Sequence, residues 1–212
     1  MTFIRKCILT LAVAAVLSVL TIWLDGQLLE YRARRELQVL QTVRVGTTTL
    51  AEIEELARRN SGRVRQPCSP ALCNVDSPLI VNTLMWKAHL AQPTRFGGGV
   101  VIENGVVDQM EVTLDVSRTG PIGLADVWVF PVGEERRILP GDPPFKVMIG
   151  RARCRGNNQD GERDVIVHMT PAATPEQQKA AFDFNLSCLS RLGGCRCGAE
   201  ILPEVLRFEK TP

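Results

Sequence analysis

An uncharged apolar run near the N-terminus constrains this chain more than any other feature. Cys7–Leu24 reads CILTLAVAAVLSVLTIWL, with Arg5 and Lys6 before it and Asp25 after it. As a helix rising about 1.5 Å per residue, this segment extends roughly 27 Å, close to the thickness of a bilayer's hydrocarbon core. The rest of the sequence has no apolar run of similar length, so the pattern predicts one membrane span.

The residues around this span predict a retained anchor rather than a cleaved signal peptide. The run ends Thr21-Ile22-Trp23-Leu24, without the small residues that precede a cleavage site, and Trp23 suits a membrane interface. Arg5, Lys6 and the amino terminus lie nearer to the span than the basic residues that follow it (Arg32, Arg34 and Arg35). We therefore expect a single-pass inner-membrane protein whose C-terminal domain is extracytoplasmic.

Cysteine usage favours the same compartment. Cys7 lies at the inner edge of the span, where we expect a reduced thiol. An even set follows the span: Cys68, Cys73, Cys154, Cys188, Cys195 and Cys197. Such a set is typical of disulfides in an oxidising compartment. Spacing favours Cys68 with Cys73 across a short loop, and Cys188 with Cys195 across the Gly193-Gly194 turn. Elimination then leaves Cys154 with Cys197.

Two other uses of these cysteines are possible. A zinc site would take Cys188, Cys195 and Cys197, with Cys154 and His168 as further ligands, but this spacing does not match the usual zinc pattern. We therefore expect no metal and no cofactor. A strained, easily reduced Cys195–Cys197 bridge is the other possibility, which would make the protein a thiol–disulfide oxidoreductase. The sequence around these cysteines lacks a thioredoxin-like βαβ pattern.

Three helices are predicted after the span. Gly26–Leu40 has apolar residues at helical spacing, and Thr49 opens a capping box for a helix that ends at Asn60-Ser61-Gly62. Thr174-Pro175-Glu176-Gln177 opens the third helix, which we expect to continue to the Gly193-Gly194 stop.

A mainly antiparallel sheet is predicted between these helices. Asn104-Gly105 favours a type I′ hairpin turn between Gly98–Glu103 and Val106–Val116. We expect Val106, Met110, Val112, Leu114 and Val116 to share one face, and Gly97-Gly98-Gly99 to be a flexible entry to the hairpin. Thr83–Leu90 fits either a short helix or a strand. The other expected strands are Arg63–Gln66, Leu79–Asn82, Ala125–Pro131, Phe145–Arg153 and Arg163–Thr170.

Together these elements predict an α+β fold: an N-terminal transmembrane helix, then a mainly antiparallel sheet flanked by helices. We divide the chain into an anchor over residues 1–25, a juxtamembrane helix and linker over 26–48, and an extracytoplasmic domain over 49–212. A further boundary could lie near 117–125.

Two stretches carry a resemblance to a known family. They are VGTTTLAEIEELARRNSG, followed by the first cysteine pair and PTRFGGGVVIENGVV, and TPEQQKAAFDFNLSCLSRLGGCRCGAEILPEV. They resemble an uncharacterised family of bacterial single-span proteins with a disulfide-containing extracytoplasmic domain. The resemblance covers most of the chain after the anchor, and AFDFNLSCLSRLGGC is its most specific part. It implies no activity and no catalytic residue.

The remaining polar motifs do not define an active site. His168 shares a predicted strand face with Asp164 but has no identifiable nucleophile or metal partner, and His89 has the pattern of a surface residue. Arg151, Arg153 and Arg155 alternate at a strand end, where they could bind an anionic partner or serve as a solvated strand edge.

A formal net charge of +2 argues against nucleic-acid binding. We expect a non-enzymatic envelope module, structural or bound to another envelope protein, with no prediction of its oligomeric state.

Overall fold

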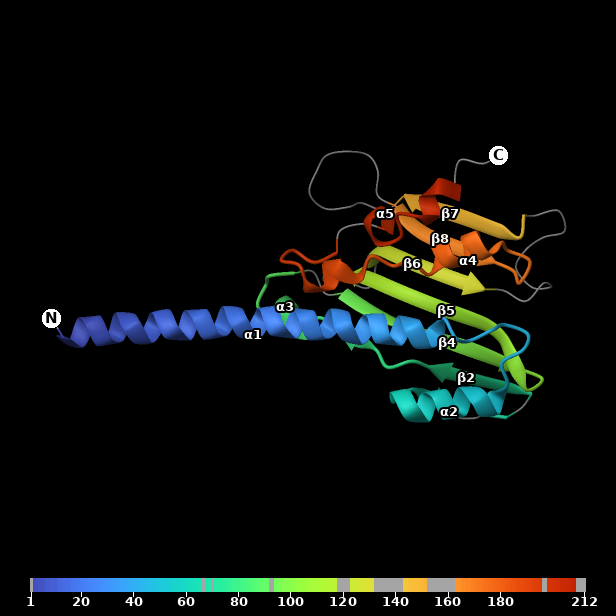
Figure 1. Ribbon diagram of the computed structural model, residues 1–212, viewed down its shortest axis with the longest axis horizontal. Helices are drawn as coiled ribbons and strands as arrows, with labels where there is room; N and C mark the ends of the chain where they lie inside the picture. The colour runs from blue at the N-terminus through green and yellow to red at the C-terminus, as the bar shows by residue number, and fades with distance from the viewer. Residues whose placement is uncertain are drawn as a thin grey trace.

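The computed structural model describes residues 2–65, 68–69, 71–91, 94–117, 123–131, 143–151, 163–195 and 198–208. It has the predicted α+β arrangement, a long N-terminal helix followed by a curled sheet with short helices (Figure 1). The helical elements are α1 (Thr2–Leu40), α2 (Leu50–Asn60), α3 (Thr83–Lys87), α4 (Pro175–Ala181), η1 (Leu186–Ser190), α5 (Gly198–Ile201) and η2 (Val205–Phe208). The strands are β1 (Arg63–Arg65), β2 (Leu72–Asp76), β3 (Ile80–Val81), β4 (Thr94–Glu103), β5 (Val106–Ser117), β6 (Gly123–Pro131), β7 (Phe145–Arg151) and β8 (Arg163–Met169).

Helix α1 is continuous through the predicted span and the predicted juxtamembrane helix. Its N-terminal half projects away from the sheet, and its apolar window has no residue buried within the protein (Figure 1). Within the span, the hydroxyls of Thr10, Ser18 and Thr21 each donate a hydrogen bond to a backbone carbonyl one turn earlier. These bonds satisfy polar groups that would otherwise be costly in lipid. This helix is long and apolar enough to cross a membrane.

The C-terminal half of α1 is part of the folded domain. Its buried apolar side chains are Leu29, Ala33, Leu37 and Leu40, and they belong to the same core as the buried apolar residues of the sheet. Residues 26–48 therefore pack into the hydrophobic core that continues from residue 49 onward. One hydrophobic core thus includes residues on both sides of residue 49, and the division of the chain into an anchor, a linker and a domain stays a prediction.

The sheet runs in the order β1-β2-β4-β5-β6-β8-β7, with β3 paired to β4 outside this path. Neighbouring strands are antiparallel except β6 and β8, which run parallel with Val129 opposite Val167. Strands β5 and β6 are paired neighbours, with Leu114 opposite Val127. One sheet thus includes both sides of the boundary that we considered near 117–125.

The β4–β5 hairpin has the turn that Asn104-Gly105 predicts, because both residues have positive φ, 55° and 82°. The prediction of which β5 side chains point into the core is wrong for the first residues of the strand. Val101 pairs with Gln109 but Ile102 pairs with Val107, so Asp108 is an extra residue in a β-bulge. The bulge reverses the alternation, and Val107 is buried in the core where Val106 was expected.

The two capping boxes are present, but the last helix is shorter than expected. Thr49 caps α2 and Thr174 caps α4, each through a reciprocal bond with the third helical residue. Helix α4 ends at Ala181, and a 3-10 turn, η1, follows after a break at Asn185. The backbone N–H of Asn185 donates to the Ile201 carbonyl, and its side-chain amide donates to the Glu200 carbonyl. These bonds to α5 replace those of a continuous helix.

Gly97-Gly98-Gly99, expected to be a flexible entry to the hairpin, is part of strand β4. This glycine segment also determines how closely α1 lies to the sheet. A Cβ at Gly98 would lie 2.7 Å from Leu40 Cδ1 and 2.6 Å from the Glu111 carbonyl oxygen. The helix can therefore approach this strand only because residue 98 has no side chain.

Strand β2 was not predicted, and it pairs with both β1 and β4. Thr83–Lys87 is helical, which resolves the ambiguity in that segment.

Candidate functional site at the junction of α1 and the C-terminal disulfide

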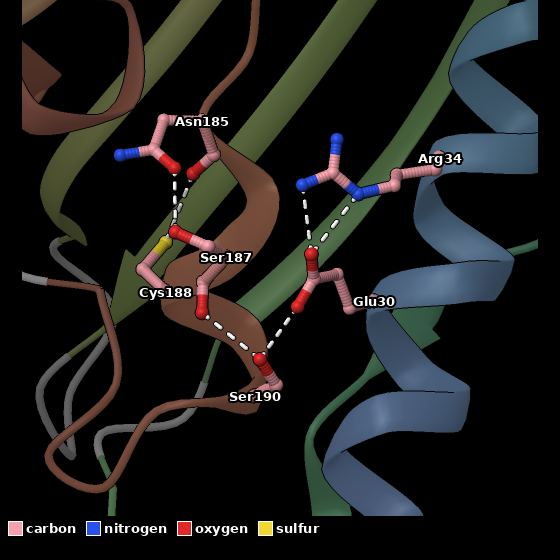
Figure 2. Close-up of polar contacts among 6 residues, drawn as sticks. All are labelled: Glu30, Arg34, Asn185, Ser187, Cys188 and Ser190. Atoms are coloured by element: carbon pink, nitrogen blue, oxygen red, sulfur yellow. Dashed lines mark hydrogen bonds and ion pairs between the residues drawn. The ribbon is translucent and has the colours of Figure 1, made fainter.

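Helix α1 is joined to the C-terminal segment by a partly buried polar contact (Figure 2). Ser190 Oγ, at the end of η1, donates a 2.5 Å hydrogen bond to Glu30 Oε2. The same carboxylate accepts bonds of 3.0 and 2.7 Å from the Arg34 guanidinium one helical turn later. One carboxylate thus links α1 to a segment that is distant in sequence.

The protonation of Glu30 depends on this contact. Burial acts to raise its pKa, but the Ser190 hydrogen bond and the Arg34 charge together hold the pKa below its ordinary value. Glu30 lies beyond the spanning residues Cys7–Leu24, where its side chain is 17% exposed. The charged form of Glu30 is therefore favoured in the folded protein.

A second acidic residue of α1 has the opposite behaviour. Glu36 is 6% exposed, and burial raises the pKa of its carboxyl although a hydrogen bond from Ser77 and the charge of Arg35 oppose that shift. Ser77 also accepts a 2.8 Å bond from the Gly98 backbone N–H. The helix-to-sheet contact therefore includes a carboxyl whose charged form is disfavoured.

The Cys188–Cys195 disulfide closes the loop beside this junction. Its Cα atoms are 4.6 Å apart, and both residues are buried. The Cys188 sulfur lies 3.5 Å from the Asn185 carbonyl oxygen, next to the Ser187 hydroxyl that bonds the Asn185 side chain at 2.6 Å (Figure 2). The Cys188–Cys195 disulfide fixes the chain reversal at Gly193-Gly194, where both glycines have positive φ.

The Cys68–Cys73 disulfide is also present, with Cα atoms 4.4 Å apart. Cys73 lies in β2 and is fully buried. These two bonds are the pairings that spacing favours. Among the described cysteines, Cys7 has a free thiol. The expected third pair, Cys154 with Cys197, lies outside the described residues.

Of the arginines and histidines singled out in the sequence, the structure describes Arg151, His168 and His89, which lie in separate segments. Arg151 ends β7, an edge strand of the sheet, opposite Arg163, whereas Arg153 and Arg155 lie outside the described residues. His168 lies in β8 between Lys146 of β7 and Phe130 of β6, and His89 is exposed with a positive φ of 57°. Within the described ranges, the structure groups no three His, Cys, Asp or Glu side chains for a metal ion.

Sequence reasoning missed a polar trough at the glycine segment of β4. It has a volume of about 590 Å³, and Arg63, Asp76, Arg95 and Glu111 supply charges of both signs to its lining. Gly97 and Gly99 supply no side chain there, and the Thr113 hydroxyl donates a 2.7 Å bond to Glu111. The Gly-Gly-Gly run was the available signal, because glycine within a strand often marks a close approach.

Comparison of the chain with protein-family models, with curated proteins and with solved structures finds no match. The resemblance to bacterial single-span proteins therefore stays an expectation from the sequence.

Proposed function

We propose that this chain is a single-pass inner-membrane protein whose extracytoplasmic domain binds another envelope protein or serves a structural role. The trough carries this proposal, because it combines two arginines and two carboxylates on a strand face that glycines leave open. Surface charges of both signs in one concave site suit recognition of a protein segment with complementary charges.

The connection between anchor and domain supports this proposal. Helix α1 enters the core, and Glu30 bonds to Ser190, so the domain is held in a fixed position relative to the span. Two disulfides in the described part of the chain suit an oxidising compartment. A fixed module beside the membrane surface is suited to holding a partner there.

Crosslinking at the trough tests partner binding. We would place a photo-crosslinking residue at Thr113, which lines the trough, and at Arg58, whose side chain is 74% exposed on α2, as the matched control. We expect one specific adduct in whole envelopes from position 113 and none from position 58. The same adducts from both positions, or none from position 113, would contradict partner binding through the trough.

Topology needs a separate test. Alkaline phosphatase fused after Pro212 is active only in an oxidising compartment, so we expect activity in a bacterial host. An inactive fusion, with activity from a cytoplasmic reporter instead, would contradict the extracytoplasmic assignment.

The alternative function, thiol–disulfide exchange at Cys195 and Cys197, makes a different prediction. Cys195 is 1% exposed and bonded to Cys188, which favours a structural role for this sulfur. Selective alkylation of Cys195 and Cys197 under mild reduction, while Cys68–Cys73 stays closed, would favour the oxidoreductase instead.

A further inference from the structure

The domain begins to pack on α1 immediately after the apolar run ends. Gly26 is buried, and a Cβ there would lie 3.0 Å from Met85 Cε of α3 and 3.1 Å from Ser190 Cα of η1. Gly26 is two residues beyond Leu24, which corresponds to roughly 3 Å along a helix. Because α1 is continuous, α3 and η1 lie at the level where the hydrocarbon core gives way to headgroups.

This end of the domain exposes large apolar side chains. Met85 is the buried residue of α3, and its neighbours Leu84 and Trp86 are 37% and 40% exposed. Leu90 and Leu192 are 38% and 68% exposed. Burying such side chains in an apolar environment would be favourable.

The loops that carry these residues are fixed together. The Gly193 backbone N–H donates a 2.7 Å bond to the Leu90 carbonyl, and Ala91 forms a parallel bridge with Gly193. The Cys188–Cys195 disulfide closes the loop that presents Leu192. Figure 1 shows α3 beside α1, at the end of the sheet from which the N-terminal half of the helix projects.

Helix α1 adds one aromatic residue on each side of Gly26 along its axis. Trp23 at the end of the span and Tyr31 about two turns later are 54% and 63% exposed. Trp and Tyr favour the membrane interface because they combine an apolar ring with a polar group. Exposed Lys87, at the end of α3, provides a cation that suits anionic headgroups.

We propose that these side chains form a second membrane contact, in which the globular domain itself rests on the bilayer surface. This membrane collar consists of Trp23, Tyr31, Leu84, Trp86, Leu90 and Leu192. Its occupant is the lipid interface, because the collar is continuous with the spanning helix and lies at headgroup level. The collar rests on α1 crossing the membrane and does not depend on what the trough binds.

Fluorine NMR of the full chain in lipid nanodiscs tests this contact. The chain contains three tryptophans, Trp23, Trp86 and Trp128, so 5-fluorotryptophan labelling gives three signals that single Trp→Phe variants assign. The discs would contain phosphatidylcholine and phosphatidylglycerol, with or without a lipid carrying a nitroxide near its headgroup. We expect the lipid nitroxide to broaden the Trp23 and Trp86 signals, and a water-soluble gadolinium chelate to broaden Trp86 weakly.

A pair of variants distinguishes an effect specific to the collar from the effect of replacing any exposed leucine. Leu192→Gln removes an apolar collar residue, whereas Leu72→Gln makes the same change at a 51% exposed leucine at the hairpin end of the sheet, opposite Glu103. We expect Leu192→Gln to reduce the lipid-induced broadening of Trp86 and Leu72→Gln to leave it unchanged.

Three results would overturn the proposal. Broadening of Trp23 by the lipid nitroxide but of Trp86 by the chelate alone would place the domain above the bilayer. Protection of Trp86 from both reagents would mean that a protein, such as a second copy of the chain, covers this face. An unbroadened Trp23 would show that α1 does not span, and would leave partner binding at the trough to its own crosslinking test.

Discussion

The side chain of Leu40 in α1 lies against Gly98, a strand residue that has no side chain of its own. A methyl group at position 98 would lie 2.7 Å from the leucine and 2.6 Å from the Glu111 carbonyl oxygen. Because backbone forms half of this contact, a rotamer change of Leu40 cannot relieve it completely. The contact sets how closely α1 approaches the sheet.

We therefore expect Gly98→Ala to destabilise the protein by about 2–3 kcal/mol, as overpacking of a well-filled core does. Gly97→Ala is the matched control, because its nearest contact would be an ordinary 3.5 Å from Leu79 Cδ1. Urea unfolding of both variants in detergent measures the difference. Equal loss of stability in the two variants would mean that the close approach of Leu40 is not what requires glycine.

The Glu30–Ser190 contact predicts a coupled effect on stability and titration. Ser190→Ala removes a hydrogen bond to a charged acceptor, so we expect a loss of about 2 kcal/mol and a rise in the pKa of Glu30. Ser187→Ala removes a bond to a neutral amide and should cost about 1 kcal/mol. Carbon-detected NMR of the Glu30 carboxyl should show no change of pKa in the Ser187→Ala control.

Glu30 and Glu36 predict opposite dependences of stability on pH. Folding lowers the pKa of Glu30, so its contribution is present above the ordinary glutamate pKa and is lost as pH falls through the folded value. Folding raises the pKa of Glu36, so its contribution is present below the ordinary value and is lost as pH rises through the folded value.

Glu36→Gln should therefore raise the melting temperature relative to the native chain more at about pH 7 than at about pH 4. Circular dichroism across this range measures the difference. Glu54→Gln, at an exposed position on α2, changes the net charge equally and serves as the control. A pH dependence that is the same in Glu36→Gln as in the native chain would show that Glu36 does not titrate with folding.

The two disulfides predict which cysteines are found linked and which is found alkylated in peptide mapping. Digestion without reductant should yield linked peptides for Cys68–Cys73 and Cys188–Cys195, with Cys7 alkylated. The Cys188→Ala/Cys195→Ala variant should lose about 2 kcal/mol, the value that loop entropy gives for a short loop. Recovery of Cys188 as a free thiol from unreduced protein would contradict this prediction.

The parts of the fold that the sequence predicts are those with local causes. The apolar run of α1, the capping boxes at Thr49 and Thr174, and the Asn104-Gly105 turn each depend on a few neighbouring residues. The two short-range disulfides follow from chain reversals that spacing and glycine make visible.

The features that were missed depend on contacts between distant segments. The bulge at Asp108 comes from the pairing of β5 with β4, and the last helix ends a few residues before Asn185, which bonds to α5. The trough was missed because a glycine run does not indicate which segments line the space beside it, and Arg63, Asp76 and Glu111 come from three different strands. The exposed face of α3 could not be assigned until Met85 was placed against Gly26.

The continuity of α1 determines where a protease could release this domain intact. A cut between Leu29 and Leu40 would remove buried side chains from the core and separate Glu30 from Ser190. The released fragment would lose part of its own interior, so shedding at these positions amounts to unfolding. In the proposed topology, an intact soluble form requires cleavage before Leu29, within a few residues of the bilayer edge, where access by an enzyme is restricted.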